Sequence, residues 1–203
     1  MNVIAVSKGR RVLCGDNLPP NKGKAVRFLP TRLEGAFQIE IEPAQDQRGF
    51  FARTFCEREF ERQELETSFV QHSISYTATK GSIRGMHFQK GSASEVKVVN
   101  CRRGAIFDVI IDLRPGSVSY GQWQGFELSG ASHNSLYIPK GFAHGFQTLT
   151  DDAEVGYLIS VFYVPDAAAG YRHDDPEFGI EWPLPVSVVS EKDRSWPDFI
   201  PAR

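Results

Sequence analysis

The sequence predicts an all-β fold, an antiparallel double-stranded β-helix of the jelly-roll type with short peripheral helices. Short apolar runs rich in β-branched residues recur along the chain, and turn residues interrupt them about every eight to twelve positions. Helical patterns do not separate these runs, and no glycine-rich phosphate loop is present, which argues against a doubly wound α/β fold. Another type of β-sandwich is the alternative.

The middle of the chain carries the clearest strand patterns. Phe37–Glu42 alternates apolar and polar side chains, as expected of a strand with one buried face. Val96–Cys101 and Ala105–Leu113 are β-branched runs separated by Arg102-Arg103-Gly104, which predicts a hairpin turn. Further strands are expected at Trp123–Leu128, Ser135–Ile138, Gly145–Leu149 and Val155–Val161, and one short charged helix at Glu57–Leu65.

The two ends of the chain differ in character. Residues 1–25 are irregular and combine glycines and prolines with charges, so we expect an N-terminal extension there. Strand-like patterns begin at Val26, and residues 26–203 are expected to form a single domain that buries its core without disulfides. Prolines break the C-terminal section into extended pieces that leave room for a short helix.

Composition narrows the classes of partner. Lys and Arg total 23 against 25 Asp and Glu, a net charge of −2, so neither nucleic acid nor a membrane is expected as a partner. Cys14, Cys56 and Cys101 are odd in number and widely spaced, as expected of reduced thiols. No apolar run reaches about 18 residues, and the first residues lack the order of a signal peptide. We therefore expect a cytoplasmic protein.

Two histidines lie in unusual settings. His87 is in the segment Ile83–Gln89, and His144 is in Pro139–Phe146. Because side chains alternate along a strand, His87 is expected to share a face with Gly85 and not with Arg84. A histidine beside a glycine on the inner face of a barrel lies where a ligand can approach closely. The ordinary alternative is a hydrogen-bonded histidine in the core or on the surface.

Metal binding is one chemical hypothesis for these histidines. The spacing Pro139-x-Gly141-x-x-His144 is similar to one signature of metal-binding proteins with this fold. The other signature needs two histidines one residue apart, but the chain has His87-Phe88-Gln89, and Glu95 is the only acid nearby. Two imidazoles without an evident third ligand do not predict a metal, so we expect none.

Acid–base catalysis without a metal is the second hypothesis. Removal of a proton beside a ketone needs a base, a donor that stabilises the enolate, and an acid that returns the proton. Histidine is a natural base, a carboxylate can orient it, a lysine or arginine can stabilise the enolate oxygen, and a tyrosine can supply the proton. The residues alone leave several candidates for each role.

The chain resembles the dTDP-4-dehydrorhamnose 3,5-epimerase family, which consists of cupins that act on sugar nucleotides. The resemblance runs from about Val26 to the C-terminus and depends on six segments in the family's order. They are Asp46–Phe51, Ile83–Gln89, Gly104–Val109, Ile138–Phe146, Asp175-Pro176 with Ile180–Pro183, and Ser190–Asp193. The resemblance implies a double-stranded β-helix, a homodimer, a nucleotide-sugar substrate, and neither a metal nor a redox cofactor.

The resemblance also implies catalytic roles. His87 matches the family's general base, and Asp193 matches the carboxylate that orients it. Tyr157 matches the general acid, and Lys97 matches the cation beside the C4 oxygen of the sugar. The ordinary alternatives are a solvated strand lysine and a core tyrosine. The match of Asp193 lies in an irregular region, where it depends on the alignment.

Five further positions match residues that bind the substrate in the family. Arg84 matches an arginine that contacts the diphosphate, and Arg48 matches one that reaches the nucleotide of the partner subunit. Gln71 matches a glutamine near the nucleoside, His144 a histidine near the substrate, and Lys192 another binding position. Surface cations and polar strand residues are the alternatives.

The chain departs from the family pattern at three positions near the substrate. Ser73 stands where an asparagine is frequent, and Arg53 and Ala168 stand where glutamates are frequent. The chemistry implied is inversion at C3, at C5 or at both carbons of a nucleotide-activated 4-keto-6-deoxyhexose in deoxysugar biosynthesis, with dTDP as the expected nucleotide. A non-catalytic cupin that binds sugar nucleotides and a 3,4-ketoisomerase are the alternatives.

Overall fold

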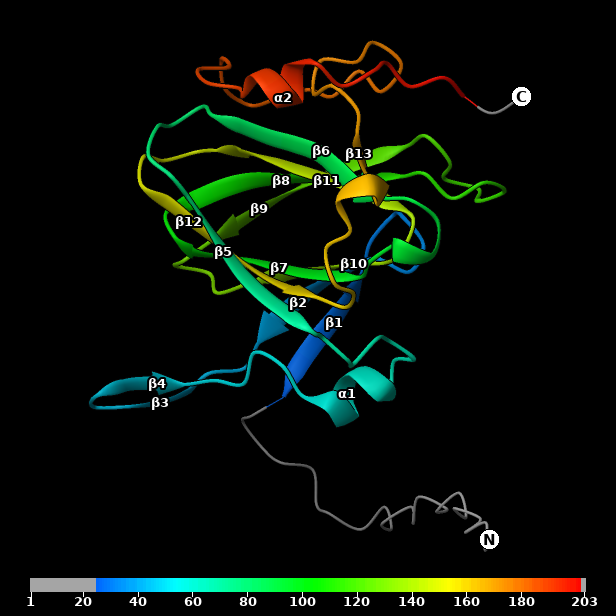
Figure 1. Cartoon of the computed structure of the whole chain (residues 1–203). Coiled ribbons are helices and arrows are strands. Elements are labelled where there is room, and N and C mark those ends of the chain that lie inside the picture. Colours follow the sequence, from blue (N-terminus) through cyan, green and yellow to red (C-terminus); the bar gives the residue numbers. More distant parts are fainter. Residues whose placement is uncertain (1–24, 202–203) are drawn as a thin grey trace, which may run out of the picture.

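Two antiparallel sheets face each other in the computed structural model, which describes residues 25–201 (Figure 1). In spatial order the first sheet contains β1 (Val26–Pro30), β2 (Phe37–Ile41), β10 (Ser135–Ile138), β7 (Lys97–Arg103), β12 (Ala153–Ile159) and β5 (Gln71–Thr77). The second contains β13 (Ala168–Gly170), β6 (Ile83–Gln89), β11 (Phe142–Thr148), β8 (Ala105–Asp112) and β9 (Trp123–Ser129). The expected jelly-roll fold is therefore confirmed.

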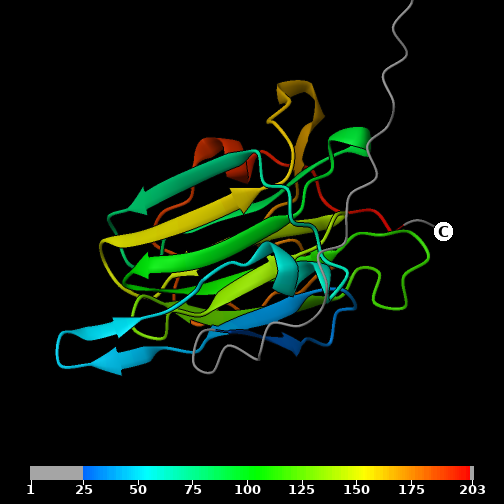
Figure 2. The same cartoon turned by 90° about the horizontal axis from the view of Figure 1, so that it is seen from below.

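A separate hairpin, β3 (Ala44–Asp46) and β4 (Gly49–Phe51), projects away from the two sheets (Figure 2). Its residues are exposed to solvent along both strands. An isolated two-stranded hairpin buries too little apolar surface to be stable by itself in water. The hairpin is therefore only weakly attached to the described part of the protomer, for example through the ring of Phe50, which lies 5.0 Å from that of His133.

Apolar side chains pack in three places: between the two sheets and on the outer face of each sheet. The inner faces meet in a core to which both sheets contribute, for example Val99 and Val155 from one and Ile110 and Phe146 from the other. The outer face of the six-stranded sheet packs on α1 (Glu57–Glu61) through the fully buried Phe60. Aromatic residues of the C-terminal segment, including Phe178 and Phe199, cover the outer face of the five-stranded sheet.

This covering explains why some strands do not alternate between buried and exposed side chains. All of β11 and most of β8 are buried, because one face of the strand meets the core and the other meets the C-terminal segment. Strands buried on both faces appear in a sequence as continuous apolar runs. The short helix α2 (Glu191–Arg194) lies over β6 within this covering layer (Figure 1).

Most of the expected elements are present with shifted ends. The turn between β7 and β8 is at Gly104, whose φ of +74° suits glycine, and β11 begins at Phe142, three residues before its expected start. The expected helix at Glu57–Leu65 ends at Glu61. The expected N-terminal extension, apart from Ala25, lies outside the described residues. No helix within residues 25–201 is long and apolar enough to cross a membrane.

One expectation about β6 is wrong. His87 and Arg84 line the same cavity, although simple alternation places them on opposite faces. On the neighbouring strand β11, His87 is opposite His144 and Arg84 is opposite Phe146. Between these pairs, Gly85 and Met86 of β6 face the single residue Gly145 of β11. Gly85, with a φ of +135°, lies within this irregularity and allows the chain to bring both side chains to one face.

Candidate active site

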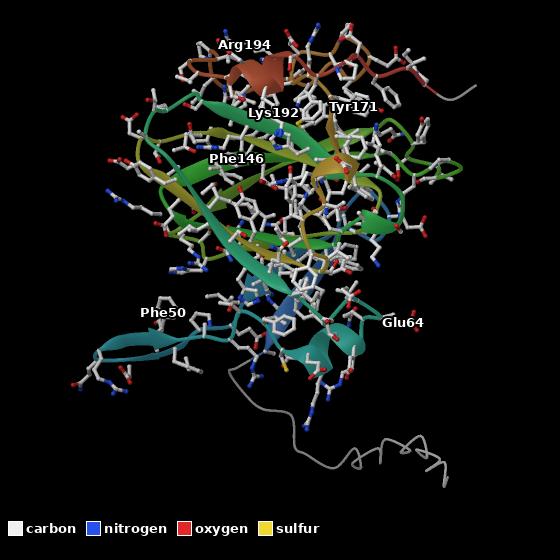
Figure 3. All side chains as sticks on the ribbon, in the orientation of Figure 1. Phe50, Glu64, Phe146, Tyr171, Lys192 and Arg194 are labelled. Carbon is white, nitrogen blue, oxygen red and sulfur yellow. The ribbon has the colours of Figure 1, made fainter. Side chains whose placement is uncertain are left out.

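A cavity of about 370 Å³ lies between the sheets, and its wall includes residues of α2 and of the loop after β12. Every predicted site residue except Arg48 lines it. The predicted residues in the cavity wall are Gln71, Arg84, His87, Lys97, His144, Tyr157, Lys192 and Asp193. Phe146 forms part of its inner wall, and Lys192 extends from α2 toward it (Figure 3). Residues from both sheets and from the C-terminal segment thus meet at one place.

His87 and Asp193 form a hydrogen-bonded pair. The distance from His87 Nε2 to Asp193 Oδ1 is 2.6 Å, and Asp193 is only 5% exposed. Burial acts to raise the pKa of Asp193, but the hydrogen bond and charge of His87, together with hydrogen bonds involving Gly85 and Ser190, outweigh it, so the pKa lies below its ordinary value. With Nε2 bonded to the carboxylate, Nδ1 is the nitrogen free to accept a proton.

Local structure places Asp193 at this position. Ser190 caps α2 by accepting a hydrogen bond from the backbone N–H of Asp193 at 3.1 Å. The backbone N–H of Gly85 donates to the other carboxylate oxygen at 3.4 Å. The ring of Trp196 packs edge-on to His87, with centroids 6.3 Å apart. The imidazole is therefore held from two sides.

Lys97 carries an ammonium group in the cavity wall close to His87. Its Nζ lies 2.7 Å from Glu95 Oε1 and 3.5 Å from the backbone carbonyl oxygen of His87. The Lys97 and Glu95 side chains are only 12% and 6% exposed. Buried charges of this kind are retained when they are paired, and this ammonium is a cation that can face a developing negative charge.

Tyr157 lines the same cavity from the six-stranded sheet, which faces the sheet that carries His87. Its hydroxyl oxygen lies 3.1 Å from Ser75 Oγ, and its ring packs edge-on to His144 with centroids 6.2 Å apart. Burial raises the pKa of Tyr157 to about 12, although the hydrogen bond with Ser75 acts in the opposite direction. The phenol is therefore protonated at neutral pH and can act as a proton donor.

His144 forms a second, deeper histidine–carboxylate pair. Its Nε2 lies 2.8 Å from Asp108 Oδ1, and Asp108 is fully buried. Burial raises the pKa of Asp108, while His144 and the charge of Lys97 act in the opposite direction. The two histidines lie directly opposite each other on β6 and β11, but each Nε2 atom contacts its own carboxylate.

The polar and cationic residues at the edge of the cavity are held in defined positions. Arg84 donates from Nε to Thr77 Oγ1 at 2.9 Å and from Nη2 to the carbonyl oxygen of Tyr76 at 3.0 Å. Gln71 accepts a hydrogen bond from the backbone N–H of Tyr163 at 2.8 Å. Lys192 lies over the ring of Trp196, 5.5 Å from its centroid.

Arg48 is the exception among the predicted residues. It lies on the turn of the β3–β4 hairpin, its side chain is 90% exposed, and it contacts Asp46 at 2.5 Å. It does not line the cavity of its own protomer. Nothing in the fold of one chain brings this guanidinium group near the other site residues.

Several residues in or beside the cavity were not predicted as catalytic or substrate-binding residues, and four of them contact predicted ones. Ser75, Glu95 and Trp196 line the cavity, and Asp108 supports His144 from behind. Asp108 lies inside one of the segments that match the family, so a search for carboxylate partners of histidine would have found it. The contact of Trp196 with His87 depends on the path of the C-terminal segment, and no local pattern indicates it.

The arrangement of possible metal ligands does not support the metal hypothesis. Within residues 25–201 no three His, Cys, Asp or Glu side chains are grouped as ligands of one ion. Glu95, the third candidate ligand, is paired with Lys97. His87 and His144 each have Nε2 bonded to a carboxylate.

Fold and site together define a cupin-type jelly-roll protein whose internal cavity contains a His–Asp pair, a buried phenol and a paired ammonium group. The family model for dTDP-4-dehydrorhamnose 3,5-epimerase matches residues 30–200. The chain belongs to this epimerase family.

Individual relatives of known name are also members of this epimerase family. The chain is 44% identical to the dTDP-4-dehydrorhamnose 3,5-epimerase of Methanothermobacter thermautotrophicus over 84% of this chain and 92% of the relative. It resembles the crystal structure of the Bacillus anthracis enzyme with TDP and pyrophosphate bound, with a TM-score of 0.84, 39% identity, and coverage of 86% of this chain and 100% of the other. The Legionella pneumophila enzyme in complex with dTDP-4-keto-L-rhamnose gives a TM-score of 0.79, 35% identity, and coverage of 85% and 92%.

Proposed function

We propose that this protein is an epimerase that inverts C3, C5 or both carbons of a nucleotide-activated 4-keto-6-deoxyhexose in deoxysugar biosynthesis, with dTDP as the nucleotide. One observation carries the proposal. His87 and Tyr157 belong to opposite sheets but line the same cavity, and Lys97 lines it too. Family membership and the names of the relatives support the substrate class.

The reaction uses the acidity that a ketone gives to its neighbouring C–H groups. His87 removes the proton from C3 or C5, and the electron pair moves to the C4 oxygen to form an enolate. Lys97 stabilises that negative oxygen, and Asp193 stabilises the imidazolium that His87 becomes. Tyr157 then delivers a proton to the same carbon from the opposite face, and the configuration is inverted. The sequence of steps needs neither a metal nor a redox cofactor, and we propose none.

Binding of the nucleotide is assigned to the edge of the cavity. Arg84 and Lys192 supply positive charge for the diphosphate, and Gln71 lies where it can contact the nucleoside. His144, backed by Asp108, lies in the wall beside Tyr157, where it can contact the sugar. These four residues are assigned to substrate binding and have no part in the proposed proton transfers.

A homodimer is the proposed assembly, with Arg48 completing the site of the partner subunit. The β3–β4 hairpin carries the exposed aromatic residues Phe50 and Phe51, which are 48% and 63% exposed. Figure 3 shows Phe50 on this projecting hairpin, away from the sheets. Aromatic residues exposed on a projecting segment are typical of surfaces that pack against another chain. We place the whole of residues 26–203 in one domain, and the protein in the cytoplasm.

Deuterium uptake tests the proposed function. The wild-type protein is incubated with dTDP-4-keto-6-deoxyglucose in D₂O, and the sugar is analysed by mass spectrometry and NMR. Uptake of two deuterons with a changed configuration indicates inversion at C3 and C5, and uptake of one indicates inversion at a single carbon. A product with the ketone at C3 would identify a ketoisomerase. Binding without uptake would identify a non-catalytic protein.

The variant His87→Ala tests the assignment of the base. We expect the rate of deuterium uptake to fall by about 10²-fold or more, since positioned acid–base groups contribute about 10²- to 10⁴-fold. His72→Ala is the matched control, because His72 is exposed and does not line the cavity. Uptake by His87→Ala at the wild-type rate, with a normal circular dichroism spectrum, would show that His87 is not the base.

A further inference from the structure

We infer that Ser75 is a positioning residue for Tyr157, and that its hydroxyl group holds the phenol in place and stabilises the phenolate left after proton delivery. The inference rests on the proposed function, because it concerns the step in which inversion occurs. The phenol lies in a cavity wall that also contains the neutral polar side chains of Gln71, Ser73 and Gln89, but Ser75 supplies the hydroxyl group that contacts it. Ser75 thereby belongs to the inversion step and not to the removal of the first proton.

The strand register brings the two side chains together. Ser75 lies on β5 directly opposite Val155 on β12, and Tyr157 is two residues farther along β12. Residues related in this diagonal way share one face of an antiparallel pair and are within reach when one side chain is long. The Ser75 Oγ to Tyr157 Oη distance is 3.1 Å. Within residues 25–201 Ser75 is the only hydrogen-bond partner of the Tyr157 hydroxyl group.

Ser73 provides a matched comparison on the same strand. It is directly opposite Tyr157 in the register and also lines the cavity. Its hydroxyl group makes no hydrogen bond with the phenol in the described structure. The two serines therefore share strand, face and cavity, and differ in their contact with Tyr157.

The physical need for a partner comes from burial. When Tyr157 gives its proton to the enolate carbon, an O–H bond breaks, a C–H bond forms, and the negative charge passes from the enolate to the phenolate. A buried phenolate is costly, as the raised pKa of Tyr157 shows, and the hydrogen bond with Ser75 acts against that cost. Arg84 acts in the same direction as Ser75, whereas the carboxylate of Asp108 opposes it.

Loss of Ser75 has a specific kinetic consequence. The enolate can recover a proton from His87 on the original face, which restores the substrate, or from Tyr157 on the other face, which inverts the carbon. In D₂O the first route exchanges the proton without inversion. Only the second route uses the phenol, so removal of the Ser75 hydroxyl group changes the ratio of inversion to exchange. A general loss of folding or of substrate binding would lower both rates together.

The experiment compares the full-length wild-type protein with Ser75→Ala, incubated with dTDP-4-keto-6-deoxyglucose in D₂O. We expect the inversion rate to fall about tenfold, the effect of one hydrogen bond to a charged group, with the exchange rate within about twofold of wild type. Ser75→Thr keeps a hydroxyl group and should restore the ratio. Ser73→Ala should leave the ratio unchanged.

The outcomes separate the inference from the proposed function. Neither exchange nor inversion in the wild-type protein would overturn the proposed function. A wild-type protein that inverts its substrate, together with a Ser75→Ala variant of unchanged ratio, would overturn the inference alone. Equal loss of exchange and inversion would also overturn it. If Ser75→Ala fails to fold, the isosteric pair Ser75→Val and Ser75→Thr decides, and the inference requires the lower ratio in the valine variant only.

Discussion

At the scale of single residues, surroundings give identical side chains different properties. His87 and His144 both have a carboxylate partner, but the His87 side chain is 43% exposed and that of His144 is 6% exposed. A general base must reach its substrate, and this difference supports His87 over His144. Among the carboxylates, the pKa of Asp108 is raised because burial dominates, whereas the pKa of Asp193 is lowered because hydrogen bonds outweigh burial.

Asp112 is the clearest case of a carboxylate that stabilises the fold. It is fully buried at the end of β8 and accepts hydrogen bonds from Arg114 Nε and Nη2 and from the hydroxyl groups of Ser117 and Ser119, at 2.6 to 2.9 Å. Burial acts to raise its pKa, but these bonds outweigh it and lower the pKa from 3.8 to about 2. A carboxylate with a lowered pKa stabilises the fold above its ordinary pKa, and this stabilisation is lost as the pH falls from about 4 to about 2.

Asp112→Asn is therefore expected to reduce the free energy of unfolding by about 2 kcal/mol at pH 7. The difference between the variant and wild type should shrink as the pH is lowered below about 4, since wild type then loses the same charge. Urea unfolding followed by circular dichroism at several pH values measures both effects. Asp174→Asn is the control, because Asp174 is an exposed ion-pair partner with an expected effect below about 1 kcal/mol. A difference that stays constant between pH 7 and pH 3 would contradict the assignment.

At the scale of elements, β6 shows how one irregular position arranges a site. The crossing of β6 and β11 at Gly85 and Gly145 is so close that a Cβ atom on Gly85 would lie 2.4 Å from Gly145 Cα and 3.0 Å from the carbonyl oxygen of His144. This irregularity brings Arg84 and His87 to the same cavity. The positions of the proposed base and of the proposed diphosphate contact thus depend on a glycine between them.

Gly85→Ala tests this dependence against a control glycine with a similar φ angle. Gly85 and Gly49 have φ values of +135° and +131°, but nothing lies within 4 Å of a Cβ atom on Gly49. Both variants have the cost of an unfavourable φ, and only Gly85→Ala adds a clash with backbone atoms. We expect Gly85→Ala to lose about 1–3 kcal/mol more of unfolding free energy than Gly49→Ala. Equal losses in chemical denaturation would show that the close crossing relaxes without cost.

At the scale of the whole molecule, one predicted site residue lies apart from all the others. Arg48 projects on an exposed hairpin, while every other predicted residue lines one cavity. The hairpin buries little surface within its own chain. A dimer in which each hairpin reaches the neighbouring cavity would bury the exposed aromatic residues and complete both sites.

Subunit mixing tests this arrangement. Arg48→Ala and His87→Ala homodimers are each expected to have low epimerase activity. In a mixed dimer, the Arg48→Ala subunit keeps its own His87 and receives an intact hairpin from the His87→Ala subunit, so one site of wild-type composition forms. We expect activity to rise when the two variants are denatured together and refolded, up to about a quarter of the wild-type value for random pairing. Activity no higher than the mean of the separate variants would show that Arg48 does not complete a partner's site.

The sequence predicts those parts of the fold and site that depend on local pattern or on motif. Continuous β-branched runs such as Ala105–Leu113 identify buried strands, because burial on both faces requires apolar residues throughout. The edge strand β5 was not expected, because most of its residues are exposed and polar side chains are tolerated there. Trp196 was missed for a related reason, since a contact across the fold leaves no local pattern.

Residue identity by itself determined the chemistry that this chain can perform. An imidazole, a phenol, an ammonium group and a carboxylate at positions that match one family are sufficient to define proton transfer, because those properties belong to the side chains. Tertiary structure alone decided which groups meet and in what state. The irregularity at Gly85, the packing of α2 over β6 and the pairing of β5 with β12 set burial and hydrogen bonding, which depend on distances between residues remote in the chain.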